Sequence, residues 1–70
     1  MEITVNTIKI KLENAVKLVD LPELIGVHFV EEEKGNVFLS DNNKMLYEIP
    51  EDALAEDGHK YVVFHLSAGG

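Results

Sequence analysis

Residues 61–66, YVVFHL, present apolar side chains on both faces of the β-strand that they are expected to form. One face would carry Val62, Phe64 and Leu66, and the other Tyr61, Val63 and His65. A strand of this kind usually lies in the middle of a sheet, where both faces are covered. Seventy residues allow one domain with one core. The pattern therefore predicts a single sheet with a late segment of the chain at its centre.

The first twelve residues alternate between apolar and polar side chains, but the alternation changes phase once. Ile3 and Val5 share a face. The later apolar set would lie on the opposite face of an uninterrupted strand and consists of Ile8, Ile10 and Leu12. A turn at residues 6–7 restores both sets to one side of a sheet. We therefore expect a hairpin of residues 2–5 and 8–12, with a bulge in one longer strand as the alternative.

Helical spacing of apolar residues begins after Asn14, a plausible N-cap. Pro22 is unsuited to the interior of a helix, because it lacks an N–H and clashes with the preceding turn. Asp20 is a plausible cap of a short helix, with Glu23 reaching back and Gly26 ending it. The helix is expected within residues 15–25, either kinked or confined to its second half.

The middle of the chain alternates between strand and turn signals. Strands are expected at residues 27–30, 37–39 and 45–49, turns at 34–36, 41–44 and 57–58, and one helical turn within 51–57. The order predicts an α+β domain in which one short helix covers one face of a mixed sheet. A C-terminal strand beside an N-terminal hairpin, at the centre of such a sheet, is the plan of the β-grasp fold.

Charge and composition restrict the classes of partner. The formal charge of −7 argues against nucleic-acid binding, which relies on lysine and arginine against phosphate. No apolar stretch approaches the roughly 20 residues of a membrane span, so no membrane partner is expected. A signal peptide is not recognisable at the N-terminus and there is no cysteine, so a cytoplasmic location is expected.

No residue set suggests catalysis by the chain itself. His28, His59 and His65 lack helical spacing, so no metal site is predicted. Ser40 and Ser67 are assigned to a turn and a tail, and no glycine-rich phosphate loop is present. The chain is therefore not expected to be an enzyme.

An apolar docking surface is expected on the sheet face that the helix leaves open. Exposed apolar patches often mark binding sites. The residues assigned to this partner-binding face are Tyr61, Val63, His65, Phe38, Met45 and Tyr47.

Both ends of the chain resemble a known family, the β-grasp sulfur carriers, which are the ThiS and MoaD relatives of ubiquitin. The resemblance rests on Val5-Asn6, the stretch LAEDG at 54–58, the apolar segment 61–66, Gly69-Gly70 and the chain length. It covers about 30 residues. Thr7 and His59 stand where the family often has glycine and an acidic residue, and the helical segment is shorter than the family's.

The resemblance implies a function at the C-terminal carboxylate. An E1-like adenylating enzyme would use ATP to adenylate Gly70, and sulfur would then replace AMP to form a thiocarboxylate. Gly69 would give clearance, because glycine has no side chain. A sulfur-accepting synthase, of thiamine or molybdopterin biosynthesis, would be the second partner, and the chain would bind no cofactor. Residues 1–66 would form the domain and residues 67–70 a flexible tail.

A second function class is compatible with the same residues. The chain would then be a small acidic interaction module or inhibitor, such as a phage-encoded regulator, that acts through the open sheet face. Its terminal glycines would have no role. The two hypotheses differ in whether removing Gly69 and Gly70 matters.

Overall fold

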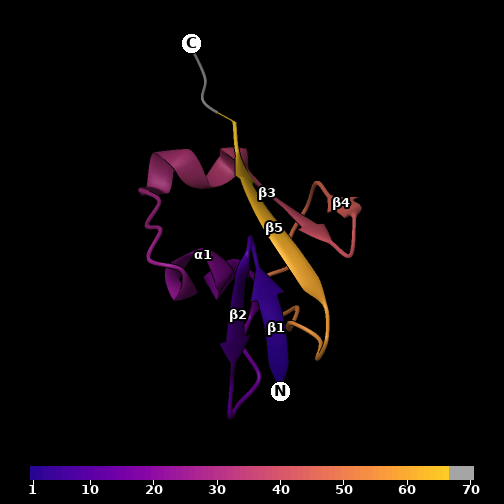
Figure 1. The fold of residues 1–70 in the computed structure, drawn as a ribbon. Coiled ribbons are helices and arrows are strands. Elements are labelled where there is room, and N and C mark those ends of the chain that lie inside the picture. The colour runs from indigo at the N-terminus through magenta and orange to yellow at the C-terminus, as the bar shows by residue number, and fades with distance from the viewer. Residues whose placement is uncertain (67–70) are drawn as a thin grey trace.

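The computed structural model describes residues 1–66, apart from the side chains of residues 31, 33 and 34. Figure 1 shows a sheet along which short helical segments lie. The elements are β1 (Glu2–Val5), β2 (Ile8–Lys11), η1 (Leu18–Asp20), α1 (Leu21–Leu24), η2 (Glu31–Asn36), β3 (Val37–Asp41), β4 (Lys44–Leu46) and β5 (Lys60–His65), where η denotes a 3₁₀-helix.

The five strands form one mixed sheet in the order β2-β1-β5-β3-β4. β5 pairs in parallel with β1 and antiparallel with β3, so the late strand lies at the centre, as Figure 1 shows. The predicted α+β class is confirmed, with a mixed sheet and one short α-helix. This arrangement is consistent with a β-grasp fold.

The N-terminal hairpin is confirmed, and the alternative of a bulged single strand is wrong. Ile3 faces Ile10 across the two strands, and Val5 faces Ile8, so the turn aligns both apolar sets. Asn6 has a φ of 58°, a left-handed conformation that asparagine tolerates better than most residues. Its side-chain Oδ1 also accepts the Val63 N–H at 3.0 Å, which ties the turn to β5.

A second tight turn joins β3 to β4 through two asparagines. Asn42 and Asn43 have φ values of 48° and 70°, and positive φ at both central residues is typical of a type I′ hairpin turn. Asn42 is also bound to Lys60: its side-chain Oδ1 accepts the Lys60 N–H at 2.7 Å, and its N–H donates to the Lys60 carbonyl at 2.8 Å. This turn is therefore fastened to the start of β5.

The short helix occupies the second half of the predicted segment. Asp20 lies at the N-cap of α1 but makes no capping hydrogen bond, because η1 precedes α1 and already places the Asp20 backbone in the right-handed helical region. Pro22 sits in the first turn, where its missing N–H has no intrahelical partner to lose. Gly26, with a φ of 79°, follows the helix as predicted.

Two predicted elements differ from the structure. Residues 27–30 form no strand, because they leave α1 with the Val27 N–H bonded to the Pro22 carbonyl and connect it to η2 without joining the sheet. Residues 51–57 form no helix beyond a single turn closed by the Ala53 N–H and the Pro50 carbonyl at 3.2 Å, because residues 53–55 pair with residues 16–18. The Leu18 N–H donates to the Ala53 carbonyl at 2.9 Å, and the Ala55 N–H donates to the Val16 carbonyl at 2.8 Å.

The core lies between the helical segment and one face of the sheet. Its buried members are Ile3, Val5, Leu18, Leu21, Leu39, Ala55 and Tyr61. Leu18 and Leu21 come from η1 and α1, and the strand residues all lie on one face. The helical segment therefore covers this face, and the opposite face stays open.

Tyr61 is the largest fully buried side chain of the core. Its hydroxyl oxygen accepts the Glu56 N–H at 2.8 Å, which provides a polar partner at the edge of an apolar site. Burial raises the pKa of the Tyr61 phenol above 10, while the Glu56 N–H acts in the opposite direction and the carboxylates of Asp41 and Glu56 add to the rise. The folded protein therefore favours the neutral phenol.

This raised pKa predicts a loss of stability at alkaline pH. Above pH 10 the unfolded chain releases the Tyr61 proton and the folded chain retains it, so the free energy of unfolding falls as pH rises toward the folded pKa. The slope is at most about 1.4 kcal/mol per pH unit. Urea denaturation from pH 9 to 11 measures it, and Tyr61→Phe should remove this component. Tyr47→Phe, at a side chain 75% exposed, should retain it; equal slopes in the two variants would contradict the assignment.

Candidate functional site

The open face of the sheet is defined by the residues that alternate with the core. Ile3, Val5, Leu39 and Tyr61 point to the helix, so their neighbours along the strands point away from it. Cross-strand pairs extend the face, since paired residues project to the same side: Thr4 pairs with Lys9 and Lys60, Phe38 with Phe64, and Ser40 with Met45 and Val62.

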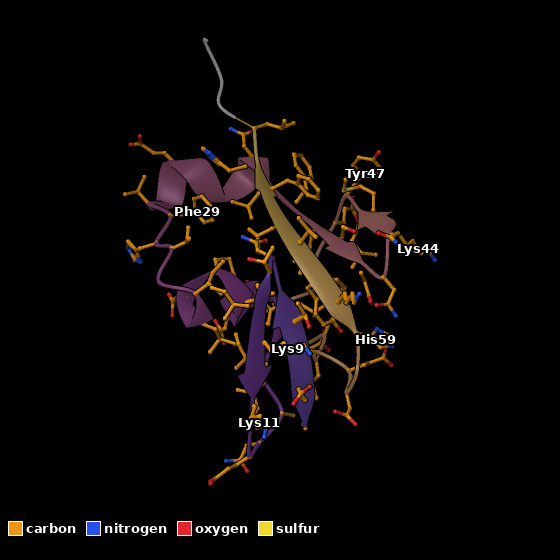
Figure 2. All side chains as sticks on the ribbon, viewed as in Figure 1. Lys9, Lys11, Phe29, Lys44, Tyr47 and His59 are labelled. Atoms are coloured by element: carbon orange, nitrogen blue, oxygen red, sulfur yellow. The ribbon has the colours of Figure 1, made fainter. Side chains whose placement is uncertain are left out.

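An aromatic patch occupies one half of this face. We use this name for Phe38, Phe64, Met45 and Tyr47. Phe38 and Phe64 are direct cross-strand partners, and the Phe38 ring contacts Tyr47 edge-on with centroids 6.0 Å apart. Tyr47, labelled beyond β4 in Figure 2, is 75% exposed, and Phe64 is 40% exposed. This is a contiguous apolar surface without a cover among the described residues.

A lysine row occupies the other half of the open face. Lys9 and Lys60 flank Thr4 on neighbouring strands, and Lys11 follows on β2, as the labels of Lys9 and Lys11 in Figure 2 indicate. These three lysines are half of the six basic residues in the chain, all of which are lysines. They are exposed and form no ion pair with any residue that the structure describes. Glu2 is the cross-strand partner of Lys11 on the same face, so this half of the open face keeps a local excess of two positive charges on an acidic protein.

Half of the predicted partner-binding residues lie on this face. Phe38 and Met45 project from it, and Tyr47 reaches it through Phe38. The other three, Tyr61, Val63 and His65, were assigned to the wrong face.

The register of β5 explains this correction. Tyr61 pairs with Val5, which is fully buried, so Tyr61 enters the core and is 0% exposed. Val63 packs against the core, and the His65 ring contacts Phe29 on the helix side with centroids 5.0 Å apart. Because β5 is apolar on both faces, its own sequence does not determine which face turns inward.

Several residues of the open face were missed at the level of sequence. Phe64 belongs to the aromatic patch, and Lys9 and Lys60 to the lysine row. A signal was present: Lys9 alternates with two isoleucines in the first hairpin, so its side chain had to lie opposite the core. Lys60 could be placed beside it only once β1 and β5 were known to be parallel neighbours.

A separate polar cluster joins the end of β3 to the loop before β5. His59 Nδ1 lies 2.7 Å from an Asp41 carboxylate oxygen, and His59 Nε2 lies 3.4 Å from a Glu56 carboxylate oxygen. Figure 2 labels His59 beside the start of β5. One ligand atom from each residue falls within 4.8 Å of the others. The two carboxylates approach different ring nitrogens, and the hydrogen bond between His59 and Asp41 links the loop before β5 to the end of β3. Sequence patterns missed it because Asp41 and His59 are 18 positions apart.

The predicted activation residues, Gly69 and Gly70, lie outside the described residues, as does the tail assigned to residues 67–70. The described strand that leads to them, β5, ends at His65. Among the described helices, none combines the length and the apolar character needed to cross a membrane.

Comparison with known proteins adds no assignment. No protein-family model matches the chain, and no curated protein matches its sequence. The fold and the open face are therefore the basis for a functional proposal.

Proposed function

We propose that this chain is a sulfur carrier of the β-grasp type, activated at the Gly70 carboxylate by an E1-like adenylating enzyme. The observation that carries the proposal is the sheet topology. β5 lies at the centre, parallel to β1, and Gly69-Gly70 follows it within five residues. This is the arrangement that the sequence resemblance implies. The resemblance itself rests on the two ends of the chain and not on its middle segment.

The proposed chemistry takes place on the carboxylate alone. A Gly70 carboxylate oxygen attacks the α-phosphorus of ATP, and pyrophosphate leaves. A hydrosulfide equivalent then attacks the carbonyl carbon of the acyl adenylate, AMP leaves, and a thiocarboxylate remains. The enzyme supplies the catalytic groups, and the chain is a protein cosubstrate. Glycine at 69 and 70 suits a narrow active-site channel, because no side chain adds width.

The open face suits the docking step of this proposal. The aromatic patch, which includes the cross-strand pair Phe38–Phe64, offers apolar contact to a partner enzyme. The lysine row offers positive charge that can orient the enzyme as it approaches. An enzyme surface with an apolar centre and acidic residues to one side would be complementary.

Intact mass spectrometry tests the proposal. The purified protein is first weighed to establish that Gly70 bears a free carboxylate in the natural product. It is then incubated with ATP, a sulfur donor and an E1-like enzyme. The expected result is a mass gain equal to the exchange of one oxygen atom for one sulfur atom, dependent on ATP. No adenylate and no mass gain with any such enzyme of the source organism would refute the proposal.

Binding of the activating enzyme should depend on the aromatic patch. Phe64→Thr retains a residue that favours strands and removes the exposed ring. We expect binding at least tenfold weaker, about 1.4 kcal/mol, measured by isothermal titration calorimetry. Ile8→Thr is the matched control, because Ile8 is 47% exposed on β2 but belongs to the helix-bearing face. Equal effects of the two substitutions would argue against docking on the open face.

The alternative, a small acidic interaction module, uses the same open face without the terminal glycines. It would show binding that depends on Phe64 but no ATP-dependent change of mass. The two measurements together therefore separate the carrier from the module.

A further inference from the structure

A groove lies on the helix-bearing side of the sheet, and Tyr47, a member of the aromatic patch, is among the residues that line it. η1 and α1 together comprise residues 18–24, a length of only about 10 Å. They cover the end of the sheet formed by β1 and β2, and a hollow of about 670 Å³ remains over β3 and β5. Its volume falls within the roughly 300–1,000 Å³ of ligand sites in proteins.

Apolar side chains line the sheet side of the groove. Leu39 and Val63, which are cross-strand partners, lie there, and Leu18, Phe29, Tyr47 and Ile49 are among the other apolar lining residues. Phe29, labelled in Figure 2, belongs to the segment between α1 and η2, and its ring packs on His65. The groove can therefore hold an aliphatic or aromatic side chain.

The charge around the groove is acidic. Asp20, Glu23 and Glu51 line it together with a single lysine, Lys17. All four side chains are exposed, and none forms an ion pair with a described residue. Two negative charges remain in excess, in a chain of net charge −7, so the potential here attracts cations. The lysine row, by contrast, makes the open face basic.

From this combination we propose that the groove binds a peptide segment of a partner protein in which an apolar side chain is flanked by lysine or arginine. The apolar side chain enters between Leu39, Val63 and Phe29, and the basic groups face Asp20, Glu23 and Glu51. The inference does not depend on the proposed sulfur-carrier function, because it uses neither the terminal glycines nor Phe38, Phe64 and the lysine row of the open face.

The test uses three capped peptides as probes, with the core sequences Lys-Leu-Phe-Lys, Glu-Leu-Phe-Glu and Lys-Gly-Gly-Lys, titrated into ¹⁵N-labelled protein. The first should shift the amide signals of groove residues and bind at least tenfold more tightly than the other two. Its affinity should fall as salt is raised, because exposed charges are screened. Equal binding of the acidic peptide, shifts confined to the open face, or no shifts at all would overturn the proposal.

Two variants and a control sharpen the test. The triple substitution Asp20→Asn, Glu23→Gln, Glu51→Gln should weaken binding of the Lys-Leu-Phe-Lys peptide at least tenfold.

The charge-matched control is Glu2→Gln, Glu13→Gln, Asp57→Asn, which removes three carboxylates from a different hollow, near Met1 and Leu12, and should leave binding unchanged.

Gly35→Phe places a ring at the groove from η2. A Cβ at Gly35 meets no atom within 4 Å, so the substitution should fold and block the peptide. Full binding by the folded Gly35→Phe protein would exclude the groove as the site.

Discussion

Deletion of Gly69 and Gly70 is expected to abolish ATP-dependent thiocarboxylate formation completely and to leave the free energy of unfolding unchanged. The loss is complete because the reacting carboxylate would then belong to Ala68, whose side chain widens the chain at the reacting position. Stability should persist because the buried core residues of the described part of the chain, residues 1–66, all lie between Ile3 and Tyr61. Intact mass after the activation reaction and urea denaturation of the same preparations measure the two quantities.

Two companion proteins make this result interpretable. Addition of one alanine after Gly70 retains both glycines but moves the carboxylate by one residue, and should also prevent activation. Ala68→Gly narrows the preceding position without moving the carboxylate and should remain active. If the protein without Gly69 and Gly70 is still converted to a thiocarboxylate, the carrier function is wrong. If the full-length protein is never converted and the shortened protein binds a partner normally, the interaction module is the better description.

Leu21→Ala is expected to cost about 3–5 kcal/mol of unfolding free energy, the range for deletion of a fully buried leucine side chain. Leu21 is 0% exposed and belongs to the buried core cluster, with Pro22 the other buried residue of α1. A domain of this length has a total stability of roughly 4–10 kcal/mol, so the substitution should remove a large share of it and lower the urea midpoint accordingly. Urea denaturation followed by circular dichroism provides the measurement.

Leu24→Ala is the control for this prediction. It lies in the same four-residue helix, has the same chemistry and is 38% exposed, so its cost should stay under about 1 kcal/mol. Because alanine has a higher helix propensity than leucine, a loss of stability reflects lost packing, and similar losses from both substitutions would contradict a selective role for the burial of Leu21. The comparison therefore tests how the helix is attached to the sheet.

The parts of the fold that were predictable are those in which the local hydrophobic pattern of a segment agrees with its position in the sheet. The phase change between Val5 and Ile8 required a turn, and Asn6 supplies the left-handed residue that the turn uses. The apolar character of both faces of β5 placed it at the sheet centre. The same apolar character on both faces left open which face of β5 turns toward the core. Tyr61 was assigned to the open face, although in its buried position its hydroxyl accepts the Glu56 N–H.

The errors occurred where tertiary contacts overrode the local strand or helix propensity. Residues 27–30 are rich in residues that favour β-strands. A strand forms only where a neighbouring strand can pair with it, and this segment pairs with no strand of the sheet. Residues 51–57 pair with the backbone near Leu18, a contact between positions far apart in the sequence. The acidic groove was not predictable either, because it arises from the shortness of the helical segment relative to the sheet.

The central position of β5 also governs how the molecule is made. Until Lys60–His65 has left the ribosome, β1 and β3 lack the strand that lies between them, and the nascent chain exposes two unpaired edges. Contacts between the first and last strands are the most distant in sequence and therefore the slowest to form. Synthesis that stops short of this segment would release a polypeptide with no completed sheet, a ready substrate for proteases.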